Sequence, residues 1–234
     1  MEENGGFATL GFLYQNVLKV SDVDWKTKTP FASIRRIVQD ERFFFKIRPG
    51  LWALKTFKNR LPTEIFPTKP LPETKKLDFN HSYYQGLLVE IGNLKSFQTS
   101  VPSQDKNKKY LDKTLGEITT ITSFYQFGYD YLVKRASTID VIWFNERRMP
   151  DSLFEVEHST DIQNSLLKFV DLQDFYAKFF IVADKVRRKE FETKAKFSAF
   201  TPLSKRVQFI NYDAVSDWHT KTYEYVVLEK QIVP

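Results

Sequence analysis

Two apolar segments that carry acidic residues constrain the fold of this 234-residue chain more than any other feature. The first spans residues 139–144 and contains Asp140, and the second spans residues 154–157, where apolar and acidic residues alternate. Because successive side chains of a strand point to opposite faces, Glu155 and Glu157 should share one face. The spacing predicts a hairpin of two strands that brings three carboxylates together.

Carboxylates beside buried strands need a compensating charge. A buried carboxylate is costly unless it is paired or binds a cation. A divalent cation that prefers oxygen ligands, such as Mg²⁺, would supply that charge to Asp140 and Glu155. The alternative is a buried acidic pair in structural salt bridges, which would require both strands to carry charge inward without a chemical role.

The pattern D-x14-E-x-E, formed by Asp140, Glu155 and Glu157, resembles the PD-(D/E)xK nuclease superfamily. The resemblance covers roughly residues 80–210, and it is greatest to restriction endonucleases in which Glu replaces the motif lysine. It implies a metal-dependent deoxyribonuclease in which Asp140, Glu155 and the Val156 carbonyl ligate Mg²⁺, with Mn²⁺ as a substitute.

The lysine of the motif is missing, because Glu157 stands where the family usually has it. Either Glu157 takes the role of this lysine, or Lys168 reaches back from the next helix. The family also often places an extra metal-binding Glu on the helix before the sheet. Glu90 matches that position, although a surface Glu is the default for any helix. His158, at the end of the second acidic strand, is a secondary candidate, because such a residue is more often structural.

The order of elements supports the same fold class. An amphipathic helix from residue 162 follows the second acidic strand, and residues 179–183 form an apolar run typical of a buried central strand. A basic helix and a strand at residues 206–210 come next. The sequence therefore predicts an α/β fold with a mixed sheet.

Composition limits the class of protein further. Hydrophobic residues make up 42% and aromatic residues 16% of the chain, as in a well-packed globular protein. The absence of cysteine excludes disulfides, thiol catalysis and zinc fingers, and it fits a reducing cytoplasm. The first residues are acidic where a signal peptide is basic, and no apolar run is long enough to span a membrane.

The positive charge is concentrated near the N-terminus. Residues 1–60 contain eleven Lys or Arg and six Asp or Glu, which leaves only about +1 of the net +6 for the rest. Such a segment suits a polyanion, because lysine and arginine gain from counterion release when they neutralise phosphates. An ordinary basic surface is the alternative.

A helix, a second helix and a hairpin are expected in this basic segment. Apolar residues at positions 10, 13, 14, 17 and 18 mark one helical face, and Thr29-Pro30 should begin a helix that buries Ile34, Ile37 and Val38. A hairpin should then follow at residues 43–54.

The strings TPFASIRRIVQ and FKIRPGLWAL of this segment resemble the HARE-type winged helix domain over roughly residues 5–56. In that family the helix is the presumed recognition helix and the hairpin is the wing, although residues 21–28 are too short for a full middle helix. The resemblance implies the following DNA-contacting residues: Ser33, Arg35, Arg36, Lys46 and Arg48. The alternative is a winged helix that docks to protein.

Prolines indicate the domain boundary. Residues 61–76 hold four of the ten prolines and should form an extended connector. We therefore expect a winged helix domain at residues 1–60, a linker at 61–76 and a nuclease domain at 77–234.

Together these features predict a site-specific endonuclease of restriction type that cuts double-stranded DNA. Such enzymes commonly form homodimers, although a monomer is equally compatible with the chain. Two alternatives are a catalytically silent DNA-binding protein and a repair or recombination nuclease that reads DNA structure.

Overall fold

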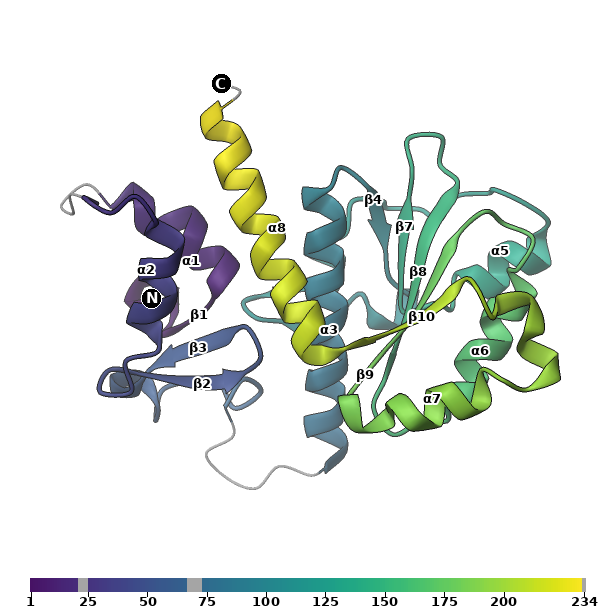
Figure 1. Ribbon diagram of the computed structural model, residues 1–234, viewed down its shortest axis with the longest axis horizontal. Coiled ribbons are helices and arrows are strands. Elements are labelled where there is room, and N and C mark those ends of the chain that lie inside the picture. The colour runs from purple at the N-terminus through teal and green to yellow at the C-terminus, as the bar shows by residue number, and fades with distance from the viewer. Residues whose placement is uncertain (21–24, 67–72, 233–234) are drawn as a thin grey trace. The chain divides into compact units, whose positions relative to one another are not determined.

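The structure, a computed structural model, describes residues 1–20, 25–66 and 73–232 (Figure 1). It divides into two compact units, one of residues 77–215 and one that combines residues 1–76 with 216–234. The larger unit carries the acidic segments, and the smaller one carries the basic segment.

A five-stranded mixed sheet forms the frame of the larger unit, with the strand order β10-β9-β8-β7-β4. Strand β7 pairs antiparallel with both β4 and β8, whereas β8, β9 and β10 run parallel. The strands are β4 (Gln98–Ser100), β7 (Val141–Phe144), β8 (Pro150–Glu157), β9 (Lys178–Ala183) and β10 (Val207–Asn211). The predicted mixed α/β architecture is confirmed at this level.

Helices make the connections between the parallel strands, which cannot be joined by tight turns. Helix α6 (Ile162–Asp171) connects β8 to β9, and α7 (Arg188–Lys194) connects β9 to β10. Asp161 caps α6, since its side chain accepts a hydrogen bond from the Gln163 N–H at 2.8 Å. The capping residue Asp161 therefore lies four residues after Glu157, the last acidic residue of β8.

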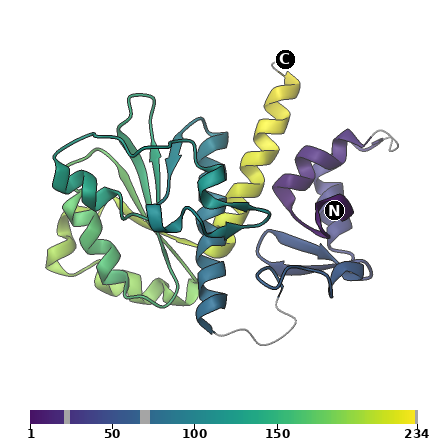
Figure 2. The same cartoon turned by 180° about the vertical axis from the view of Figure 1, so that it is seen from behind.

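Helices cover both faces of the sheet (Figures 1 and 2). Helix α3 (Glu73–Leu94) covers one face, where the Trp143 indole donates to the Leu88 carbonyl at 3.1 Å. Helices α5 (Asp130–Ala136) and α6 cover the other face. The remaining short elements are β5 (Lys109–Tyr110), β6 (Lys113–Thr114), α4 (Leu115–Ile118) and the 3-10 turns Ser103–Asp105, Lys185–Arg187 and Ser198–Leu203.

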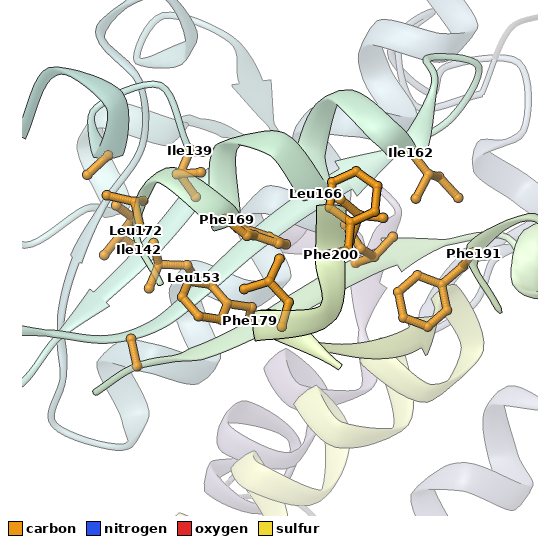
Figure 3. Close-up of a cluster of buried hydrophobic side chains, with 14 of the residues drawn as sticks. Ile139, Ile142, Leu153, Ile162, Leu166, Phe169, Leu172, Phe179, Phe191 and Phe200 are labelled. Atoms are coloured by element: carbon orange, nitrogen blue, oxygen red, sulfur yellow. The ribbon is translucent and has the colours of Figure 1, made fainter. Parts of the chain in front are cut away.

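The main core lies between α6 and the sheet. Figure 3 shows Leu166 and Phe169 of α6 above Leu153 and Phe179 of the strands, and all four side chains are buried. Burial of a side chain of this size contributes roughly 1.5–3 kcal/mol. The helix is thereby fixed at the sheet, and so is its polar side, which carries Ser165 and Lys168.

The smaller unit contains a three-stranded sheet in the order β1-β3-β2, and the turn at Gly50 between β2 and β3 adopts a positive φ of 75°. Its elements are β1 (Phe7–Thr9), α1 (Leu10–Asn16), α2 (Pro30–Val38), β2 (Phe44–Arg48) and β3 (Leu51–Leu54), with 3-10 turns at Glu2–Asn4, Val17–Lys19 and Lys55–Phe57. The second helix and the hairpin predicted from the sequence are both present, as α2 and as strands β2 and β3.

The first helix begins at Leu10, the first residue of the expected helical face, and residues Phe7–Thr9 before it form a strand that pairs with β3. One local expectation for this unit was wrong. Ile37 is 49% exposed, whereas Ile34 and Val38 are buried. The buried stripe of α2 is therefore narrower than its apolar composition predicts. Of the expected short middle segment, residues 21–24 lie outside the described residues.

The last helix, α8 (Tyr212–Ile232), is shared by the two units. Tyr223 and Val227 pack against the apolar cluster of the smaller unit, which explains why residues 216–234 group with it and not with the domain expected from the sequence. Of the expected connector, residues 67–72 lie outside the described residues, and α3 already begins at Glu73. Within the described ranges, no helix is both long and apolar enough to cross a membrane.

Candidate functional site

Asp140 lies at the start of β7, beside the acidic end of β8. The pairing of Val141 with Phe154 brings Asp140 next to Glu155 and Val156 on the neighbouring strand. The Val156 N–H donates to Asp140 Oδ2 at 2.7 Å. The hairpin predicted from the sequence thus brings the first acidic residue beside the second.

Glu155 is almost fully buried, with 2% of its surface exposed. Lys168 Nζ donates to both of its carboxylate oxygens, at 2.9 and 2.8 Å, and the Ser165 hydroxyl lies 3.0 Å from Oε2. Burial, followed by the charge of Asp140, raises the pKa of the Glu155 carboxyl well above its usual range, although Lys168 and Ser165 oppose the shift. One ammonium group therefore compensates only part of the local negative charge.

Glu157 extends from the same face of β8 and is also buried. Its two carboxylate oxygens accept hydrogen bonds from the hydroxyls of Ser165 and Thr160. Arg187 approaches Glu157 Oε2 to 3.9 Å and donates to the carbonyls of His158 and Thr160. These contacts hold the Glu157 carboxylate in one orientation.

A second group of side chains contacts Asp140 from the opposite side. His81 Nε2 of α3 lies 3.4 Å from Asp140 Oδ1 and 3.9 Å from Asp105 Oδ2. Burial would lower the pKa of His81, but the charge of Asp140 and a hydrogen bond to it produce a net increase. The same contacts and the Val156 N–H lower the pKa of Asp140 against the effect of burial.

These groups line one polar cavity of about 340 Å³. The lining includes all three carboxylates of the sequence motif together with the following side chains: His81, Lys108, His158, Ser165 and Lys168. A cavity with this mixture of acids and cations can hold both a metal ion and an anionic oxygen.

His158, the secondary candidate, also lines this cavity, with its ring held in place. Tyr212 Oη lies 2.7 Å from His158 Nδ1 and donates to the Glu157 carbonyl at 2.8 Å. Burial, and then the charge of His81, lowers the pKa of His158 to about 4. The imidazole is therefore neutral near pH 7.

The cavity gathers most of the catalytic and metal-binding candidates singled out from the sequence. Asp140, Glu155, Val156, Glu157 and Lys168 all line it.

Glu90 does not belong to this lining. Its carboxylate accepts a hydrogen bond from Tyr110 Oη at 2.8 Å, and nine residues of helix separate it from His81, a rise of roughly 13 Å. The helix side chain that does reach the cavity is His81.

Two residues near the cavity were not identified from the sequence. His81 carried no motif, and only the register of α3 over the sheet brings it to Asp140. Asp105 lies in a segment that reads as a solvated loop, yet it is only 4% exposed. The i, i+4 spacing of His81 and Gln85 was an available signal, since it places two polar side chains on one face of an apolar helix.

The predicted DNA-contacting residues all belong to the smaller unit. Arg36 and Lys46 are exposed, on α2 and β2, whereas Ser33 and Arg48 are partly buried. Arg35 donates to Tyr14 Oη at 2.8 Å and to Glu224 of α8 at 3.0 Å. Its guanidinium therefore makes structural contacts.

Fold and cavity together define a mixed α/β domain with a carboxylate-rich polar site. Residues 61–229 match the family described as the type II restriction enzyme NmeDI C-terminal domain, and since this is more than half of the chain, the chain belongs to that family. It is similar to the type II restriction enzyme NmeDI of Neisseria meningitidis serogroup C, with 28% identity over 171 residues, or 67% of this chain. The match covers 48% of that relative, so the chain spans about half its length. No solved structure matches the chain.

Proposed function

We propose that this protein is a site-specific endonuclease of restriction type that hydrolyses phosphodiester bonds of double-stranded DNA with a divalent metal ion. The observation that carries the proposal is the contact of Asp140 with the Val156 N–H, which brings the carboxylates of Asp140 and Glu155 side by side in a cavity of about 340 Å³, with Lys168 bound to Glu155. Membership of a family of restriction-enzyme domains supports the same activity.

The residues of the cavity fit a hard divalent cation such as Mg²⁺. Asp140, Glu155 and the Val156 carbonyl offer oxygen donors, which Mg²⁺ and Mn²⁺ prefer. Burial, and then the charge of Asp140, raises the pKa of Glu155, and a bound cation would oppose both effects. When bound there, the ion would polarise a phosphate oxygen and promote ionisation of water.

The chain's own side chains would orient the other reactants. Lys168 would fix Glu155, and its positive charge would stabilise the negative charge of a phosphate in the cavity. Glu157, held by Ser165 and Thr160, would accept the proton of the attacking water. Lys168 and Glu157 would thus divide the role of the missing motif lysine.

The strand order supports assignment of the larger unit to the PD-(D/E)xK fold. An antiparallel pair, β7 and β8, carries the acidic residues, and α6 then leads to a parallel neighbour, β9. In this assignment Lys168 lies on the helix that follows the second acidic strand.

The smaller unit would bind the DNA target as a winged helix. Helix α2, the β2–β3 hairpin and the net positive charge of residues 1–60 support this assignment. Arg36 on α2 would contact bases, and Lys46 on β2 would hold phosphate, since both side chains are exposed. Arg35 would instead stabilise the unit.

Digestion of methylated and unmethylated bacteriophage DNA with Mg²⁺ tests the proposed activity. We expect discrete fragments from the unchanged chain and none from Glu155→Ala. Glu192→Ala is the matched control, because Glu192 is an exposed residue of α7. Absence of cleavage with DNA binding retained in a gel shift would identify a silent DNA-binding protein, and cleavage confined to branched DNA would identify a repair or recombination nuclease.

A further inference from the structure

Two exposed tyrosines lie next to each other at the start of α5. Tyr129 is 75% exposed and Tyr131 is 70% exposed, although aromatic rings gain from burial. The two rings are parallel to within 8°, and their centroids are 6.2 Å apart. Asp130, between them in the chain, accepts a hydrogen bond from the Gln126 amide at 2.7 Å. The tyrosines therefore present an ordered aromatic surface to solvent.

The exposed side of α5 leads from these tyrosines to the carboxylate cavity. Residues three, four or seven positions apart lie on one side of a helix, so Tyr131, Lys134 and Thr138 share a side. A hydrogen bond from its N–H to the third residue before it keeps Thr138 on the helical path. All three residues are exposed, whereas Ala136 is buried. The Thr138 carbonyl accepts a hydrogen bond at 3.1 Å from Lys168 Nζ, and Lys168 lines the cavity.

Lys134 supplies an uncompensated positive charge on this side of α5. Within the described residues Lys134 makes no ion pair, whereas the neighbouring Arg135 pairs with Asp171 at 2.5 Å. A phosphate group that approaches Lys134 therefore does not have to displace a carboxylate of the protein.

A nucleotide with a free base face is the ligand that fits this arrangement. Bases stack on exposed aromatic rings, and nearby cationic side chains bind the phosphates of the same strand. In a duplex the neighbouring base pairs cover both faces of each base, so only an unpaired base can stack in this way. The rise from Tyr131 to Thr138 is roughly 10 Å, a distance that about three nucleotides of a strand cover.

We propose that Tyr129 and Tyr131 stack on an unpaired base of the DNA strand that enters the cavity, and that Lys134 binds a phosphate of this strand. The inference rests on the proposed function, because that function supplies the strand. It adds that the duplex is opened beside the cut, about three nucleotides from the phosphate in the cavity. The stacking contacts offset the free energy that opening takes.

Fluorescence anisotropy of a labelled oligo(dT) single strand, with EDTA to prevent cleavage, tests the stacking. Tyr131→Leu should weaken binding about 10-fold, because an aliphatic side chain cannot stack on a base, whereas Tyr131→Phe should bind as tightly as the unchanged chain. Tyr225→Leu is the matched control, since Tyr225 is 62% exposed and lies on α8 in the smaller unit. Lys134→Gln should lower the logarithmic salt dependence by about 0.7, the value for one phosphate contact with a single strand.

Photo-crosslinking locates the base independently of the affinity, to which the smaller unit would also contribute. Oligo(dT) that carries one 4-thiothymine should crosslink to the peptide that contains Tyr129 and Tyr131, as identified by mass spectrometry. Tyr131→Leu should lose most of this product, and circular dichroism should show that the variant keeps its fold. A crosslink confined to other peptides would overturn the proposal, whatever the affinities are.

Two further results would contradict the proposal. Equal loss of binding in Tyr131→Phe and Tyr131→Leu would show that the hydroxyl, and not the ring face, makes the contact. A dimer that dissociates in Tyr131→Leu, without a crosslink at these tyrosines, would show that they join two copies of the chain. Mg²⁺-dependent cleavage of duplex DNA is measured in parallel. Its absence together with a crosslink at the tyrosines would overturn the nuclease assignment and not the base-binding site.

Discussion

Lys168 Nζ lies 2.8 Å from Glu155 Oε2 and 2.9 Å from Oε1, although thirteen residues separate Lys168 from Glu155 in the chain. The side chain reaches the strand from α6, where it also donates to the Thr138 carbonyl at 3.1 Å. Lys168 thereby brings an ammonium group to the Glu155 carboxylate. Strand β8 itself provides none, because the residue two positions after Glu155 is Glu157.

The first prediction concerns this ammonium group. Lys168→Met should lower the single-turnover rate of DNA cleavage by roughly 10²–10³-fold, because the positive charge that fixes Glu155 and faces the phosphate is lost. Lys178→Met is the matched control, since Lys178 is 64% exposed and 3.9 Å from Asp151. Equal rates for the two variants would exclude a role of Lys168 in cleavage.

Ser165 is the subject of the second prediction. Its hydroxyl contacts Glu155 Oε2 and Glu157 Oε1, yet it has one proton to donate. The hydroxyl therefore lies between the two carboxylates and restricts the orientation of both. Ser165→Ala should free both carboxylates and lower the cleavage rate about 10–100-fold, with a native circular dichroism spectrum. A wild-type rate in this variant would contradict the positioning of Glu157.

The third prediction separates two neighbouring arginines of α2. Arg36→Ala should weaken DNA binding and reduce its logarithmic salt dependence by about one, as expected for one lost phosphate or base contact. Arg35→Ala should instead lower the free energy of unfolding by about 0.2–1 kcal/mol, because the Arg35 side chain is 39% exposed and its pair with Glu224 is screened. Salt-dependent gel shifts and denaturant unfolding measure the two effects. Weaker DNA binding in Arg35→Ala together with a lower free energy of unfolding in Arg36→Ala would instead identify Arg35 as the DNA contact.

The sequence predicts most of the sheet but only part of the cavity. Residues 139–144 and 154–157 have strand periodicity and a hairpin spacing, so Asp140 and Glu155 could be paired from the pattern alone. The cavity also depends on which turn of α3 crosses the sheet. Nothing in the local sequence shows whether Glu90 or His81 lies at that turn. Asp105 resembles a residue of a solvated loop in the sequence, since its burial depends on contacts with Gln85 and Lys108.

The grouping of the C-terminal helix could not be predicted for a similar reason. Glu224, Tyr223 and Val227 contact residues of the smaller unit that precede them by about 190 to 210 positions, and single-sequence periodicity carries no information on such pairs. The residues of α8 by themselves carry only a local preference for a helix. Its partners are set by tertiary packing alone.

The fourth prediction concerns pH and a surface pair in the turn between α2 and β2. Hydrogen bonds from the Arg42 side chain and backbone hold the pKa of Asp40 at about 2, below its ordinary 3.8. A lowered pKa means that the pair stabilises the fold above the ordinary pKa and that this contribution is lost as pH falls toward 2. In Arg42→Ala, which keeps the backbone N–H, the Asp40 pKa should rise part of the way from about 2 toward 3.8, which carboxyl NMR titration measures. An unchanged value would show that the backbone contact alone maintains the shift.

The fifth prediction tests the packing of α3. Ala is usually the better helix residue, and Gly86→Ala would gain about 1 kcal/mol from propensity alone. A Cβ at position 86, however, would overlap the ring of Tyr110. Tyr110 is 2% exposed and its hydroxyl is bound to Glu90, so the ring has little room to move. Overpacking of this kind costs about 1–3 kcal/mol, and the net effect should be destabilising. Denaturant unfolding measures the change, and Tyr110→Leu in the Gly86→Ala background should recover part of it. A Gly86→Ala chain that is more stable than the unchanged one would show that α3 does not pack this closely against Tyr110.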